Sequence, residues 1–367
     1  MTDPRLSELA VRKTGTPIEE LQEEYGLDTI IRLFANENPW GPSPLAVRAM
    51  REAVGHVHRY PGICEDELRS KIANLMGPEF DRHHVLVANG SCDVLRVLCQ
   101  AFLHGGGESI ICPSTFPLYE LYTKMFGGHP VLVDPKDYAY DLPAMSQRIG
   151  DRTRLVFVCN PNNPTGTMLT QRQVDEFMEQ VPERVVVVFD EAYCDYVEEE
   201  HYADVTRHIR EGRNVVVART FSKIYGLAGL RVGYAVASKD LTDYLLRVLS
   251  PYHVPALGLI GAAAGLDDQE HIRRSREHNA EQKRYLYREL DRLDISYVPT
   301  QCNFILLVDL GRDVPALWQA LVRHGVVVQQ THAFGVPDAL RITIGTGEEN
   351  ERLVEALELV IREVAGR

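Results

Sequence analysis

Four short polar strings in the sequence carry groups that could do chemistry together. They are Asn89-Gly-Ser-Cys-Asp93, Asn160-Pro-Asn-Asn-Pro-Thr-Gly166, Asp190-Glu-Ala-Tyr193 and Arg219-Thr-Phe-Ser-Lys223. Lys223 offers an amine that can form a Schiff base with a carbonyl compound, provided that a low dielectric and nearby cations depress its pKa. Asp190 offers a carboxylate that can keep a nitrogen base protonated, and Asn163 and Tyr193 can donate to an anionic oxygen.

A pyridoxal cofactor would use all of these groups, because it needs an amine, an anion near its ring nitrogen, donors near its ring oxygen, an aromatic neighbour and a phosphate site. Phe116 can stack on the ring. Ser91 and Cys92 stand where an amphipathic helix is expected to begin, and its free N–H groups can hold a phosphate. Ser222 and Arg231 can add a hydroxyl and a charge-assisted contact. The sequence therefore predicts pyridoxal 5'-phosphate as the cofactor.

Each of these residues alone has a simpler interpretation. A single lysine is usually a solvated surface residue, Asp190 could cap a helix, and residues 160–166 could be only a turn. Phe116 could be a core residue. The order of the four strings along one chain favours a shared site.

The elements that must position these strings are short β-branched runs separated by helical stretches. Runs that are apolar on both faces are typical of parallel strands covered by helices, and ligands bind at the carboxyl ends of such strands. The expected strands of this α/β sheet are Val85–Ala88, Ser109–Cys112, Val131–Val133, Leu155–Cys159, Val185–Phe189, Val215–Ala218 and Val232–Ala237.

The pattern changes near residue 251, which predicts a second, smaller α/β domain. This part contains a long charged helix over Glu270–Leu293 and two strand-like runs, Phe304–Val308 and Leu340–Ile344. We expect an arm over residues 1–40, with an amphipathic helix near Pro17–Tyr25, to pack on the small domain. A large domain over residues 41–250 and a small domain over residues 251–367 complete the prediction.

Composition favours small molecules as partners, although the negative charge could equally be only a solubility feature. The net charge of −13 over 367 residues argues against a broad nucleic-acid or anionic-membrane footprint, and no apolar run is long enough to span a bilayer. The N-terminus lacks an apolar signal core. Seven scattered cysteines, without a C-x-x-C pair or histidines at metal-ligand spacing, predict a reduced cytoplasmic setting and no metal site.

The order of motifs resembles the histidinol-phosphate aminotransferase branch of the fold-type I pyridoxal-phosphate (PLP) enzymes across nearly the whole chain. The motifs that carry the resemblance are NENPWGPSP, YPG, NGSCD, NPNNPTG, DEAY, RTFSK followed by Arg231, NFIL and LRITIGTGEEN. The resemblance implies a homodimer and glutamate as the amino donor. It implies that Lys223 is the Schiff-base lysine, Asp190 the ring-nitrogen partner and Arg341 the arginine that binds the substrate carboxylate.

The remaining roles follow from the same resemblance. Asn163 and Tyr193 would contact the cofactor's ring oxygen, and the dimer partner would lend Tyr60 to the phosphate. The residues implied to hold that phosphate within one chain are Ser91, Cys92, Ser222 and Arg231. Asn38, Trp40 and Gln329 are the expected substrate-binding residues.

The sequence departs from the family at two places. Gln329 stands where the family has an arginine that helps to hold a distal phosphate of the substrate, and a neutral amide cannot replace a bidentate guanidinium there. Losing one charge-assisted bond weakens binding of a phosphorylated substrate by about tenfold. The second departure, Cys92-Asp93 in place of Asp-Glu, matters less because backbone groups hold that phosphate.

Three functions compete. The first is an aminotransferase with an aromatic or imidazole 2-oxo acid or aldehyde as acceptor. The second is a PLP-dependent decarboxylase of the threonine-phosphate type, and the third is a binding homologue without turnover. A nicotinamide enzyme is disfavoured because no predicted strand is followed by G-x-G-x-x-G.

Overall fold

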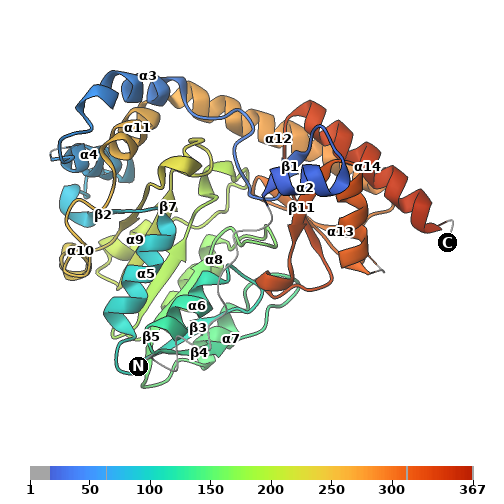
Figure 1. The fold of residues 1–367 in the computed structure, drawn as a ribbon. Helices are drawn as coiled ribbons and strands as arrows, with labels where there is room; N and C mark the ends of the chain where they lie inside the picture. The colour runs from blue at the N-terminus through green and yellow to red at the C-terminus, as the bar shows by residue number, and fades with distance from the viewer. Residues whose placement is uncertain (1–16, 63, 311–312, 366–367) are drawn as a thin grey trace, which may run out of the picture.

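Two β-sheets organise the chain, each with its own hydrophobic core (Figure 1). The computed structural model describes residues 17–62, 64–310 and 313–365. None of the described helices combines the length and the apolar character that a membrane crossing requires.

The larger sheet has seven strands in the order β2-β8-β7-β6-β5-β3-β4. Strand β8 runs antiparallel to both of its neighbours, and the pairings from β7 to β4 are parallel. The predicted mostly parallel seven-stranded sheet is therefore confirmed. Its strands are β2 Val85–Ala88, β3 Glu108–Ile111, β4 His129–Leu132, β5 Thr153–Cys159, β6 Val186–Asp190, β7 Val215–Thr220 and β8 Gly233–Val236.

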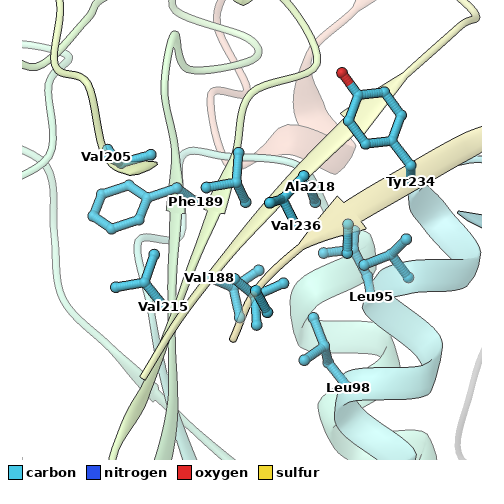
Figure 2. Close-up of a cluster of buried hydrophobic side chains, with 14 of the residues drawn as sticks. Leu95, Leu98, Val188, Phe189, Val205, Val215, Ala218, Tyr234 and Val236 are labelled. Carbon is cyan, nitrogen blue, oxygen red and sulfur yellow. The ribbon is translucent and has the colours of Figure 1, made fainter. Parts of the chain in front are cut away.

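The central strands are covered on both faces. Val188 and Phe189 are consecutive residues of β6, so their side chains point to opposite faces, yet both are fully buried. Figure 2 shows Phe189 directed toward Val205, while Val188 lies on the side of Leu95 and Leu98. This double coverage explains why the strand sequences are continuous apolar runs.

The helices around this sheet start at recognisable caps. Ser43 and Ser238 accept hydrogen bonds from backbone N–H groups of α3 and α10, and Thr170 forms a capping box with Gln173. The helices are α3 Pro44–Ala53, α4 Cys64–Met76, α5 Ser91–Phe102, α6 Leu118–Met125, α7 Leu142–Gln147, α8 Gln171–Met178, α9 Thr206–Arg210, α10 Lys239–Leu246 and α11 Ala256–Asp267.

Helix α11 packs on the large-sheet side of the molecule, against α3 and α4. Leu259, Ala262 and Leu266 belong to the same buried cluster as the large sheet. The predicted domain boundary near residue 251 therefore precedes a helix that packs with the first domain, and that boundary stays a prediction.

The smaller sheet has five strands in the order β1-β11-β12-β10-β9. Strand β1 is parallel to β11, and the other pairings are antiparallel. The strands are β1 Ile31–Leu33, β9 Tyr297–Val298, β10 Phe304–Leu307, β11 Val326–Gln330 and β12 Leu340–Thr343, and the helices are α12 Gln269–Arg292, α13 Val314–Arg323 and α14 Gly347–Ala365.

The described part of the N-terminal arm lies against this smaller sheet (Figure 1). Helix α2, Ile18–Tyr25, buries Leu21 in a cluster with Val322 and Val327. Strand β1 then adds to the edge of the sheet beside β11. The chain leaves β1 toward the large sheet, which brings residues 35–37 to the cavity described next.

Candidate active site

A cavity of about 280 Å³ lies at the carboxyl ends of β5, β6 and β7. Residues of the arm and of the small sheet also line it. The structure brings together ten of the residues predicted from the sequence along its wall: Ser91, Cys92, Phe116, Asn163, Asp190, Tyr193, Ser222, Lys223, Arg231 and Arg341.

Lys223 follows the end of β7 and is half-buried in this wall. Its Nζ donates a hydrogen bond to the carbonyl oxygen of Ala35 at 2.9 Å. Burial, followed by the positive charge of Arg341, lowers the pKa of the lysine from 10.5 to about 8. With this pKa roughly a tenth of the amine is neutral at pH 7, far more than for an ordinary lysine, and the neutral amine is the nucleophile.

Asp190 is the last residue of β6 and is 3% exposed. Its Oδ2 accepts a hydrogen bond from the Tyr119 hydroxyl at 2.9 Å, and its Oδ1 accepts one from the Ala192 backbone N–H at 3.2 Å. Burial raises the pKa of this carboxyl to about 6, against the lowering effect of these hydrogen bonds. A buried carboxylate in a cavity wall suits a cationic ligand group, such as a protonated ring nitrogen.

The beginning of α5 forms an anion site with Arg231. Gly90 precedes the helix with φ +80°, and a Cβ atom there would lie 2.7 Å from Arg231 Nη2. A Cβ on Gly233 would lie 2.3 Å from the backbone nitrogen of Ser91. Arg231 Nη1 also donates to Ser222 Oγ at 3.3 Å. Backbone N–H groups, a hydroxyl and a guanidinium therefore converge where a phosphate would bind.

Arg341 is 3% exposed and lies on β12. Its Nη1 donates to Asn163 Oδ1 and its Nη2 to the carbonyl oxygen of Phe34, the second bond at 2.6 Å. Its Nε has no partner among the described residues. A buried cation with a spare donor in a cavity wall is suited to a carboxylate.

Comparisons with known sequences show the family of this chain. A model of the family described as aminotransferase class I and II matches residues 28–357. The chain belongs to this aminotransferase family. Histidinol-phosphate aminotransferases from Moorella thermoacetica and Akkermansia muciniphila are 44% and 41% identical to it, over 95% and 96% of this chain and 89% and 97% of theirs.

Solved structures show the same fold. A histidinol-phosphate aminotransferase from Sinorhizobium meliloti, in complex with pyridoxal-5'-phosphate, has a TM-score of 0.89 at 24% identity, covering 99% of this chain and 98% of that one. An aspartate aminotransferase from Thermus thermophilus with maleate has a TM-score of 0.85 at 21% identity, covering 99% of each chain. The predicted fold-type I architecture is confirmed.

This chain is a PLP-dependent aminotransferase, as the sequence predicted. The cavity fits the cofactor, because it offers a buried carboxylate, a lysine of lowered pKa and an anion site with no room for a Cβ atom at Gly90 or Gly233. Lys223, Asp190 and the start of α5 are the groups that would hold it. The decarboxylase and the non-catalytic homologue are not favoured, since the relatives are aminotransferases.

Sequence reasoning missed several residues of the site of this aminotransferase, among them Asn36, Phe334 and Tyr119. Asn36 and Phe334 line the cavity, and Phe334 lies 4.9 Å from the Arg341 guanidinium. Tyr119 lies behind the cavity wall. It lies in the first turn of α6, and no sequence signal distinguished it from a core residue.

Gln329 and Tyr60 lie outside the cavity wall of the aminotransferase. Gln329 Nε2 donates to the carbonyl oxygen of Gln330 at 2.7 Å. Tyr60 is 79% exposed and stacks on Tyr252 at 4.6 Å between ring centroids. Their expected roles stay predictions.

Asn38 and Trp40 also lie outside this wall. The Asn38 side chain donates to the carbonyl oxygen of Ile224 and to Ser275 Oγ, so it ties the arm to both domains. Trp40 is half exposed, and its ring is nearly perpendicular to that of His278 at 5.2 Å between centroids. The expected roles of Asn38 and Trp40 in substrate binding stay predictions.

Proposed function

We propose that this aminotransferase moves an amino group from glutamate to an aromatic or imidazole 2-oxo acid or aldehyde, with weakened recognition of a distal phosphate. One structural observation carries the proposal. Gln329 is paired directly with Arg341 across β11 and β12, and directly opposed residues project from the same face of a sheet. Gln329 is therefore placed beside the arginine that would hold the substrate carboxylate.

The chain's own residues account for the proton transfers. When bound, the cofactor supplies a ring that withdraws electrons from the substrate's α-carbon. Lys223, with a pKa of about 8, can hold or release a proton beside that carbon as general acid and base. Asp190 would keep the ring nitrogen protonated, while Asn163 and Tyr193 would donate to the ring oxygen. Arg341 would orient the substrate through its carboxylate.

The surroundings of Arg341 suit an aromatic or imidazole group. Phe334 lies against its guanidinium, and Phe116 lines the same cavity. Glu37 also lines the cavity, so the mouth carries a carboxylate, which is paired with Arg32 at 3.7 Å. These contacts support a flat, uncharged or weakly basic distal group more than a dianion.

Absorbance spectra of half-reactions test the proposal. Single amino acids are added to the holoenzyme, and loss of the cofactor's long-wavelength absorbance reports transfer of the amino group to it. Glutamate should cause this loss, and an imidazole or aromatic oxo compound should restore the starting spectrum. A spectrum that no amino acid changes would refute the proposed reaction.

We also propose a homodimer. Tyr60 does not line the cavity of its own chain, so it could reach a cofactor phosphate only in a second copy. Val54, Val57, Tyr60 and Tyr252 are each more than half exposed, which supports a protein contact there. Sedimentation of an active monomer would exclude this role for Tyr60. The reduced cytoplasmic setting remains a prediction.

A further inference from the structure

A chain of buried hydrogen bonds runs from the small sheet through Asn36 to Tyr193. The Asn36 backbone N–H donates to Thr343 Oγ1 at 3.0 Å, and the Thr343 hydroxyl lies 3.2 Å from Asn36 Oδ1. The Asn36 side-chain Nδ2 lies 3.0 Å from the Tyr193 hydroxyl oxygen. The three residues are at most 4% exposed, so bulk water does not replace these partners.

The bonds in this chain have one consistent set of directions. The Asn36 backbone N–H donates to Thr343 Oγ1, and the Thr343 hydroxyl donates its own hydrogen to Asn36 Oδ1. The amide group of Asn36 is thereby oriented with its NH₂ end toward Tyr193. The Tyr193 oxygen accepts that bond, which leaves its single hydrogen to be directed elsewhere.

We propose that Asn36 and Thr343 are positioning residues, which turn the Tyr193 hydroxyl hydrogen into the cavity so that it can donate to the cofactor's ring oxygen. Tyr193 lines the cavity on the large-sheet side. Burial raises its pKa, so the hydroxyl keeps the hydrogen that it has to donate. The inference rests on the role proposed above for Tyr193.

This arrangement joins the carboxylate site to the cofactor site. Thr343 and Arg341 are two residues apart on β12, so their side chains project from the same face. Asn36 has φ +54° and lies in the arm, just beyond β1. Tyr193 is held as a donor toward the cavity only when the arm and the small sheet are docked on the large sheet.

The test uses the holoenzyme and the pH at which the bound cofactor changes colour. A donated hydrogen bond stabilises an anionic ring oxygen, so losing the donor raises the midpoint of this titration. Thr343→Val should raise it by about 1 pH unit, and Tyr193→Phe by at least as much. Thr343→Ser, which keeps the hydroxyl, should restore the wild-type midpoint.

The double variant distinguishes an effect transmitted through the hydrogen bonds of Thr343, Asn36 and Tyr193, called the relay below, from a general disturbance of packing. In the Tyr193→Phe background, Thr343→Val should cause no further shift, because both changes remove the same donated bond. Thr153→Val is the control. It removes a buried hydroxyl at the end of β5 that is farthest from the cavity, and it should leave the midpoint unchanged.

An unchanged midpoint in Thr343→Val would overturn the relay. So would a further shift caused by Thr343→Val in the Tyr193→Phe background. A Tyr193→Phe variant with the wild-type midpoint would instead refute the role of Tyr193 itself, and the relay with it.

Discussion

The Tyr119 hydroxyl donates a hydrogen bond to Asp190 Oδ2 at 2.9 Å from behind the cavity wall. Its ring is fully buried and stacks on Phe157 at 4.9 Å, so the hydroxyl is held in place. The bond stabilises the charged form of Asp190, which burial opposes. Tyr119 therefore helps to keep a carboxylate ionised where the cofactor's ring nitrogen would lie.

Removal of this hydroxyl should weaken cofactor binding. In Tyr119→Phe, the pKa of Asp190 should rise above its value of about 6, so a smaller fraction is ionised near neutral pH. A hydrogen bond to a charged group contributes about 1.5–3 kcal/mol, so its loss should raise the PLP dissociation constant about tenfold at pH 6, where ionisation of Asp190 becomes limiting. Equilibrium dialysis at pH 6 and pH 8 should show the larger loss at pH 6.

The matched control is Tyr140→Phe, which removes a buried hydroxyl bonded to Thr115 and to the Cys159 backbone N–H but not to Asp190. Its PLP affinity should stay near that of the wild type. Equal affinities in Tyr119→Phe and wild-type protein would contradict the prediction.

The lowered pKa of Lys223 predicts how cofactor capture depends on pH. Below about pH 8 the amine is mostly protonated and unreactive, so the rate at which cofactor-free protein captures PLP should increase as the pH rises through about 8. Arg341→Gln removes a cation that disfavours the charged amine. In this variant the midpoint of the pH dependence of the capture rate should therefore lie at higher pH. Stopped-flow absorbance measures this rate.

Arg274→Gln is the control for this charge effect, because Arg274 lies over the exposed ring of Trp40 instead of in the cavity wall. Its midpoint should match the wild type. If the pH dependence of the rate in Arg341→Gln matches that of the wild type, the charge of Arg341 does not contribute to the lowered pKa of Lys223.

A guanidinium at position 329 should improve the binding of a phosphorylated substrate. Gln329→Arg places a second cation on the face that carries Arg341, and one charge-assisted bond predicts about a tenfold lower dissociation constant for histidinol phosphate. Gln330→Arg places the same charge on the opposite face of β11 and should have no such effect. Inhibition constants of phosphorylated ligands would measure the difference, and equal constants in both variants would argue against Gln329 facing the substrate.

Gly335 holds the segment that carries Phe334 close to the large domain. It has φ +73°, and a Cβ atom there would lie 2.2 Å from the carbonyl oxygen of Pro113. Gly335→Ala should therefore displace Phe334, lower the melting temperature and raise KM. Gly212→Ala shares the positive φ but meets no atom within 4 Å, so it should cost only about 1 kcal/mol and leave KM unchanged. Similar KM values in both variants would contradict the close contact.

Much of the large domain follows from the sequence because its strands are long enough to show their pattern. β2 has its predicted bounds, β5 and β7 are each two residues longer at one end, and β6 is shifted by one residue. β1 and β9 were missed because three and two residues cannot show an alternation. β11 was missed although its valines are typical of a strand.

The sequence by itself determined the parts of the site that follow strand ends, since parallel strands bring their carboxyl ends to one edge and so gather Asp190 and Lys223. Only the tertiary structure decided that Gln329 opposes Arg341, that Tyr119 supports Asp190 and that Asn36 reaches Tyr193. Periodicity reports which face of its own element a residue occupies. Contacts between elements depend on strand register and on how the arm and two sheets pack, which no local pattern contains.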